Sequence, residues 1–97
     1  MKIPLIIGID AIHGNGMVAG TTVYPSPISL ASTFDEKIAY QIGKETAIEV
    51  RAHGSHWSFT PNIDVLRDPR WGRVGETFGE DPFLVGNFGV ELSLIHI

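Results

Sequence analysis

The stretch Ile3-Pro-Leu-Ile-Ile-Gly-Ile9, which ends at Asp10, decides the fold class. Its apolar residues are continuous rather than alternating, which is typical of a parallel strand that is buried on both faces. The run is far shorter than the roughly 20 residues that a membrane span requires. It is also a poor match to a signal peptide, because Pro4 lies inside it and no small-residue cleavage site follows. Asp10 is expected at the C-terminal end of the strand, where a charge needs a partner or a ligand.

The residues after this strand are predicted to form a loop and then a long helix. Residues 13–22 contain three glycines and an asparagine, which are typical of a loop. Irregular structure is expected to continue through Tyr24-Pro-Ser-Pro27. A helix is then expected from about Phe34 to about Ala52, with Gly54 as its C-terminal stop.

Local patterns support the start and the apolar face of this helix. Thr33 is followed three residues later by Glu36, which matches a capping box in which each side chain bonds the other's backbone amide. Phe34, Ile38 and Ile42 recur at the spacing of one helix face. We therefore expect these three side chains to face the core.

The second half of the chain predicts a second strand and a second helix. Residues 56–60 are rich in aromatic residues and form a short strand candidate. Asp81-Pro82 reads as a helix start, because proline fits the first helical turn. The apolar face of that helix is expected to hold Phe83, Leu84, Phe88 and Leu92. The order strand, helix, strand, helix is that of α/β proteins with a parallel sheet.

Composition excludes several classes of protein. The chain has 97 residues, a formal charge of −4 and 43% hydrophobic residues, which is compatible with one small globular domain. The acidic balance argues against nucleic-acid binding. The chain has no cysteine, so neither disulfides nor thiolate metal sites are available.

The polar run Arg67-Asp-Pro-Arg-Trp-Gly-Arg73 lies in a predicted loop. Arginine is the preferred donor for forked hydrogen bonds to carboxylates and ligand oxygens, and tryptophan offers a flat apolar face. One interpretation is recognition of a polyhydroxylated ligand. The other, which the chemistry alone favours, is a set of structural ion pairs with the nearby carboxylates Asp64, Asp68, Glu76, Glu80 and Asp81.

Two groups of residues look like metal ligands at first sight. Asp10 and His13 form an Asp-x-x-His pattern, and His53 and His56 flank Gly54. For His13 a bond to loop backbone is the favoured role. For the second pair it is the satisfaction of free carbonyls at a helix end. No metal site is therefore predicted.

Three segments taken together resemble the family-3 glycoside hydrolases, which include β-glucosidases and β-xylosidases. They are Gly8-Ile-Asp-Ala-Ile-His-Gly-Asn15, Glu45-Thr-Ala-Ile-Glu-Val-Arg-Ala-His-Gly54, and the polar run with Gly79-Glu-Asp-Pro82. The resemblance covers roughly residues 3–90. It implies a (β/α)₈ TIM-type barrel, of which residues 1–97 are a fragment of roughly two βα units. Residues 93–97 drift from the expected helix, and we interpret them as a non-native tail.

The resemblance also implies roles for individual residues. Asp10 and Arg73 would bind hydroxyls of the sugar at the cleaved end. The nucleophilic Asp and the acid/base Glu of the family lie further along the polypeptide, so no catalytic residue is assigned in this chain, and no metal ligand either.

The implied activity is that of a retaining, exo-acting β-glycosidase, a β-glucosidase first of all, which hydrolyses terminal β-linked sugars in carbohydrate metabolism. The expected partners are a small-molecule glycoside or oligosaccharide and the remainder of the barrel, with no cofactor, nucleic acid or membrane. The full-length parent is expected in the periplasm or outside the cell, and the fragment alone is expected to be inactive. The alternatives are a non-catalytic carbohydrate-binding protein and, more remotely, a metal-dependent hydrolase that uses Asp10, His13 and the other histidines.

Overall fold

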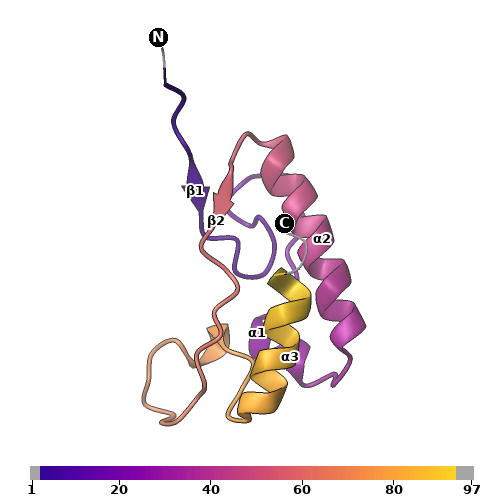
Figure 1. Cartoon of the computed structure of the whole chain (residues 1–97), viewed down its shortest axis with the longest axis vertical. Coiled ribbons are helices and arrows are strands. Elements are labelled where there is room, and N and C mark those ends of the chain that lie inside the picture. Colours follow the sequence, from indigo (N-terminus) through magenta and orange to yellow (C-terminus); the bar gives the residue numbers. More distant parts are fainter. Residues whose placement is uncertain (1–2, 94–97) are drawn as a thin grey trace.

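The computed structural model describes residues 3–93 and shows the predicted alternation of strands and helices (Figure 1). Two short elements were not predicted, the helix α1 and the 3-10 turn η1. Proline at the first position of α1 accounts for its start, because the fixed φ of proline fits a first helical turn. The elements in order are β1 (Gly8–Ile9), α1 (Pro27–Ala31), α2 (Glu36–Ala52), β2 (Trp57–Ser58), η1 (Val74–Glu76) and α3 (Pro82–Ser93).

The strands β1 and β2 pair in parallel, with Gly8 opposite Trp57 and Ile9 opposite Ser58. The backbone amide of Phe59 extends the ladder by donating to the carbonyl of Ile9 at 3.1 Å. The prediction of a parallel α/β arrangement is therefore confirmed. Figure 1 shows that both strands run in the same direction, so their C-terminal ends meet at one edge.

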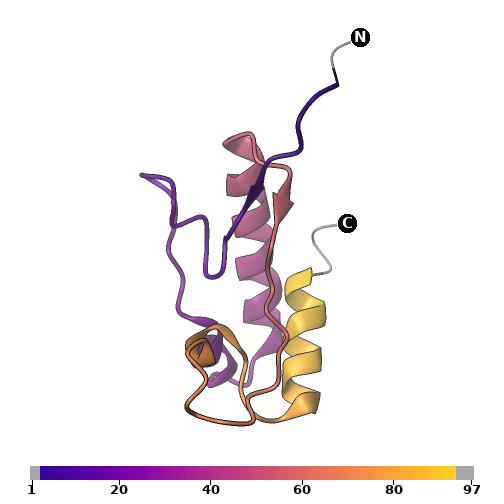
Figure 2. The same cartoon turned by 90° about the vertical axis from the view of Figure 1, so that its left-hand side faces the viewer.

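The prediction that the first strand is buried on both faces is wrong for this chain. Only its last two residues form β1, while Ile3 and Leu5 are 86% and 82% exposed. The preceding residues run away from the body of the molecule (Figure 2). A parallel strand is buried only when other strands flank it and helices cover both faces. Within residues 3–93 the sheet has two strands, so this covering is incomplete.

The helix α2 begins two residues later than predicted, and the capping box is wrong. Asp35 is the N-cap, and its carboxylate accepts from the backbone amide of Lys37 at 3.0 Å. Phe34 has a φ of +55°, which excludes it from the helix, and its side chain is exposed. The Thr33 hydroxyl accepts from the amide of Asp35 at 3.1 Å instead of capping a helix that starts at Phe34.

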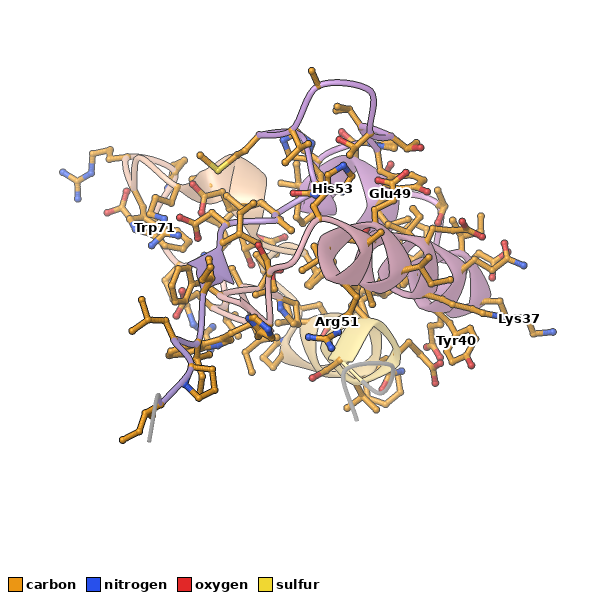
Figure 3. All side chains as sticks on the ribbon, turned by 90° about the horizontal axis from the view of Figure 1, so that it is seen from above. Lys37, Tyr40, Glu49, Arg51, His53 and Trp71 are labelled. Atoms are coloured by element: carbon orange, nitrogen blue, oxygen red, sulfur yellow. The ribbon has the colours of Figure 1, made fainter. Side chains whose placement is uncertain are left out.

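The C-terminal end of α2 is as predicted. Gly54 has a φ of +87°, the left-handed conformation that commonly ends a helix. The ring Nδ1 of His53 lies 2.7 Å from the carbonyl oxygen of Glu49, with both residues at the end of the helix (Figure 3). His53 therefore contacts a carbonyl at the helix end, as predicted, but this carbonyl is not free, because it also accepts from the backbone amide of His53 at 3.2 Å.

The helix α3 also begins where predicted, but one residue of its apolar face is wrong. The carboxylate of Asp81 accepts from the amide of Phe83 at 2.9 Å, which caps the helix. Val85, Phe88 and Leu92 are buried, whereas the Phe83 side chain is 75% exposed. Phe83 lies two positions before Val85, which is about 200° around the helix and therefore on the other side.

The core lies between the helices α1, α2 and α3 and the residue Phe78 after η1. The rings of Phe78 and Phe88 are 5.6 Å apart between centroids, and Asn87 donates to Glu36 at 2.8 Å between α3 and α2. The loop that carries η1 is therefore attached to the helical core. The buried cluster consists of Leu30, Ala31, Ala39, Phe78, Val85, Phe88 and Leu92.

No helix within residues 3–93 combines the length and the apolar character needed to cross a membrane. Ser93 is the last residue of α3, which agrees with a helix up to that point. The rest of the predicted tail, residues 94–97, lies outside the described residues.

The isolated chain of 97 residues is expected to lack a stable cooperative fold. Large apolar side chains remain exposed along the first strand and beside the second, among them Ile6, Trp57 and Phe59. Burial of apolar surface contributes about 25 cal/mol per Å², while ordering costs roughly 1.5 kcal/mol per residue. Thermal denaturation followed by circular dichroism should show no sharp transition. A sharp transition in a monomer with dispersed amide resonances would contradict this expectation.

Candidate functional site

A pocket of about 280 Å³ opens at the edge where β1 and β2 end. Asp10 follows β1 directly, and Arg73 enters from the loop before η1. The structure thus brings both sequence-predicted binding residues to one pocket, although they are far apart in the chain. The pocket is lined by Asp10, Ile12, Phe59, Thr60, Pro61, Asn62, Ile63, Asp64, Arg73 and Glu76.

Hydrogen bonds fix the loops that form this pocket. The hydroxyl of Thr60, after β2, donates to the carbonyl of Ala11, after β1, at 3.2 Å. The hydroxyl of Thr77 donates to the carbonyl of Asp64. Two residues after Asp64, the amide of Leu66 donates to the carbonyl of Gly79 at 2.9 Å. These bonds join the two ends of the long polar loop between Leu66 and Thr77. The residues after the loop therefore lie beside the residues that follow β2.

Arg73 and Glu76 form a salt bridge at the pocket wall. Both Nε and Nη2 of Arg73 donate to the same oxygen, Oε2 of Glu76, at 2.8 and 2.6 Å. This hydrogen bonding lowers the pKa of Glu76 and raises the pKa of Arg73. The carboxylates of Asp64 and Asp10 raise the pKa of Arg73 further, so their charges act on the same guanidinium.

Arg70 has a different environment. Its Nη2 lies 2.6 Å from Oδ2 of Asp68, its Nε bonds both carboxylate oxygens, and its backbone amide donates to Oδ1 at 2.9 Å. The Arg70 side chain is 87% exposed and does not line the pocket. The ion-pair interpretation is therefore confirmed for Arg70, whereas Arg73 belongs to both an ion pair and the pocket.

Fewer carboxylates form ion pairs in the structure than the sequence analysis considered as partners for the arginines. In the part of the chain that the structure describes, the salt bridges are Asp68–Arg70 and Arg73–Glu76. Glu80 takes part in neither. Asp81 caps α3 instead.

The histidines are spread over several parts of the fold. His13 and Asp10 border a neighbouring pocket of about 290 Å³. The prediction that His56 satisfies a free helical carbonyl is wrong, because its Nδ1 instead lies 3.5 Å from the amide of Ile7, in the extended segment before β1. Across residues 3–93, no three His, Cys, Asp or Glu side chains form a group that could hold a metal ion.

The sequence analysis did not single out Asn62 and Asp64 as pocket residues. The side-chain oxygen of Asn62 accepts from the amide of Asp64 at 3.2 Å, and both residues line the pocket. The signal that could have found them is position, because they follow β2 as Asp10 follows β1. The sequence predicted Asp64 as one of the carboxylates that form structural ion pairs with the arginines.

Comparison with known protein families places this arrangement among carbohydrate-active enzymes. The family described as "Glycosyl hydrolase family 3 N terminal domain" matches residues 1–93. A periplasmic beta-glucosidase from Salmonella typhimurium is 39% identical over 89 residues, which are 92% of this chain and 11% of that protein. A beta-xylosidase from Formosa agariphila is 42% identical over 86 residues, which are 84% of this chain and 12% of that protein.

Among solved structures, a β-glucosidase involved in saponin metabolism from intestinal bacteria is similar to this chain with a TM-score of 0.91. The two are 47% identical, and the similarity covers 93% of this chain and 12% of the other. This chain therefore spans little more than a tenth of the length of the proteins that it matches.

The salt bridge predicts a defined pH dependence. Because hydrogen bonding from Arg73 lowers the pKa of Glu76, the pair should persist below the ordinary pKa of a glutamate. It should be lost only as the pH falls through the lowered pKa. Carbon-13 NMR of the Glu76 carboxyl, in a folded protein that contains this segment, measures this titration.

Arg73→Gln should move the Glu76 titration up towards the ordinary value. Arg70→Gln is the matched control, because it removes the partner of Asp68 and should leave Glu76 unchanged. A Glu76 carboxyl that titrates at the same pH with and without Arg73 would show that the salt bridge does not form in solution.

Proposed function

Because this chain belongs to glycosyl hydrolase family 3, we propose that it is part of the catalytic barrel domain of a retaining, exo-acting β-glycosidase. The observation that carries the proposal is the convergence of Asp10 and Arg73 on one pocket at the C-terminal ends of parallel strands. In (β/α)₈ barrels, active sites are built from the loops at this end of the strands.

The proposed architecture is two βα units of a (β/α)₈ barrel. Parallel pairing of β1 with β2, with α2 between them in the chain, is the unit from which such barrels are built. A complete barrel takes about 250 residues, so further strands from the same polypeptide would flank this pair. The family match covers residues 1–93, and the interpretation of residues 93–97 as a non-native tail stays a prediction.

The proposed role of Asp10 and Arg73 is to bind the hydroxyls of the terminal sugar. A carboxylate accepts hydrogen bonds from two adjacent hydroxyls, and a guanidinium donates to ring hydroxyls. Hydrogen bonds to charged groups contribute about 1.5–3 kcal/mol each. The aromatic and apolar residues Phe59 and Ile63 supply a less polar wall to the same pocket.

The pair of reacting carboxyls is proposed to come from further along the polypeptide. Retaining glycosidases need a nucleophile and an acid/base about 5–5.5 Å apart, and the acid has a raised pKa. Glu76 is unsuited to be the acid, because the hydrogen bonds from Arg73 lower its pKa. Asp10 is assigned to sugar binding. One carboxylate would form the covalent glycosyl-enzyme as the leaving group departs, and the other carboxyl would protonate that leaving group and then deprotonate the attacking water, so the mechanism needs no metal or organic cofactor.

The proposed substrates are small glycosides or oligosaccharides with a terminal β-linked glucose. The relatives include both a β-glucosidase and a β-xylosidase, and the solved structure described above is a β-glucosidase. Because these proteins are named as glycosidases, the alternative of a non-catalytic carbohydrate-binding protein is not favoured.

In the full-length enzyme, Asp10→Ala and Arg73→Ala are each expected to lower kcat/KM by about 10-fold or more. Each substitution removes a charged partner from sugar hydroxyls, and about 1.4 kcal/mol corresponds to a factor of ten. Initial rates with 4-nitrophenyl β-glucoside and β-xyloside measure the effect. Arg70→Ala is the matched control and should mainly lower stability. Near-normal kinetics for Arg73→Ala in a folded enzyme would remove it from the site.

The chain of 97 residues by itself is expected to have no glycosidase activity. The two reacting carboxyls are proposed to lie outside it, and Asp10 and Glu76 are assigned to other roles. Incubation of the purified chain with the same chromogenic glycosides should release no more nitrophenol than buffer does. Turnover that survives purification and disappears in Asp10→Ala or Glu76→Ala would contradict the assignment of the catalytic pair.

A further inference from the structure

The salt bridge between Arg73 and Glu76 leaves part of the guanidinium available. A guanidinium has five N–H donors. Glu76 accepts from Nε and Nη2 through the single oxygen Oε2, which occupies two of these donors. The remaining donors belong to Nη1 and to the second hydrogen of Nη2. One edge of Arg73 is therefore held by Glu76, and within residues 3–93 the other edge makes no hydrogen bond at the pocket that both residues line.

Glu76 is held more firmly than Arg73. Its side chain is 29% exposed, against 59% for Arg73. Its backbone amide donates to the carbonyl of Arg73 at 3.0 Å, which closes the turn η1. The next two residues, Thr77 and Phe78, are buried and attach this turn to the core. Glu76 therefore provides a fixed anchor for a long and flexible side chain.

Glu76 also affects how Arg73 interacts with the other carboxylates of the pocket. Asp10 and Asp64 also line the pocket. Without Glu76, the guanidinium would still be attracted to these carboxylates, since opposite charges attract one another over several ångströms. A contact between Arg73 and Asp10 would use up the acceptor that the sugar hydroxyls need. The hydrogen bonds from Arg73 to Glu76 compete with such a contact and leave the Asp10 carboxylate to the sugar.

We propose that Glu76 is a positioning residue, which orients the Arg73 guanidinium toward the sugar and keeps it from pairing with Asp10. The inference rests on the proposed sugar-binding role of Arg73. Asp68 and Arg70 provide a matched control, because they form a salt bridge of the same chemistry outside the pocket.

A double-mutant cycle in the full-length enzyme tests this proposal. Glu76→Ala is expected to lower kcat/KM by about 10- to 100-fold, because a misplaced binding group can cost about 100-fold. In the Arg73→Ala background the same substitution should cost less than about twofold, since residues that act through one another are not additive. Glu76→Gln keeps an acceptor oxygen and should show a smaller loss with the same dependence on background. Asp68→Ala should leave kcat/KM within about twofold in both backgrounds.

The outcomes separate the proposal from the function on which it rests. Equal losses from Glu76→Ala with and without Arg73, or no loss at all, would overturn the positioning role while the sugar-binding role of Arg73 stands. A fall in melting temperature with equal kinetic losses in both backgrounds would mean that Glu76 only supports the fold. If Arg73→Ala itself leaves kcat/KM unchanged, the proposed sugar-binding role of Arg73 fails, and the positioning role fails with it.

Discussion

The parallel pairing of β1 with β2 is the constraint on which the candidate site depends. The register of Gly8 with Trp57 and Ile9 with Ser58 puts the ends of both strands at one edge. Gly8 also leaves room for the side chain of Phe59 after β2, because a Cβ atom at position 8 would lie 2.7 Å from the tip of that ring, which would have to move. A one-residue slip would turn side chains to the opposite face, so Asp10 and the loop after β2 would no longer share a pocket.

The helical core provides the second fixed point. Thr77 and Phe78 are buried beside α3, so the loop that ends in Arg73 returns to the body of the molecule. Gly89 on α3 makes room for the side chain of Ile63, because a Cβ atom at position 89 would lie 2.5 Å from it. The pocket wall at Ile63 thus rests on the helix, which connects packing in the core to the position of the charged residues.

Two arginines of one loop form similar salt bridges, but only one of them lines the pocket. Arg70 and Arg73 each pair with a carboxylate two or three residues away. Exposed pairs of this kind contribute little to stability, typically about 0–1 kcal/mol. The Arg73–Glu76 pair differs because it lines the pocket. The carboxylates of Asp10 and Asp64 line the same pocket.

Local sequence patterns predicted the order of the main strands and helices, the parallel class, the C-terminal end of α2, the start of α3, and the position of Asp10 after the first strand. These features depend on local chemistry, such as the left-handed glycine at Gly54 and the cap at Asp81. Local chemistry failed at Phe34 and Phe83, whose side chains are apolar but exposed. The chemistry of the polar run did not distinguish its arginines, and only the resemblance named Arg73. The tertiary structure places Arg73 at the pocket, leaves Arg70 outside it, and makes Glu76 the partner of Arg73. Several carboxylates lie within reach in the sequence, and the packing of Thr77 and Phe78 against the core selects among them.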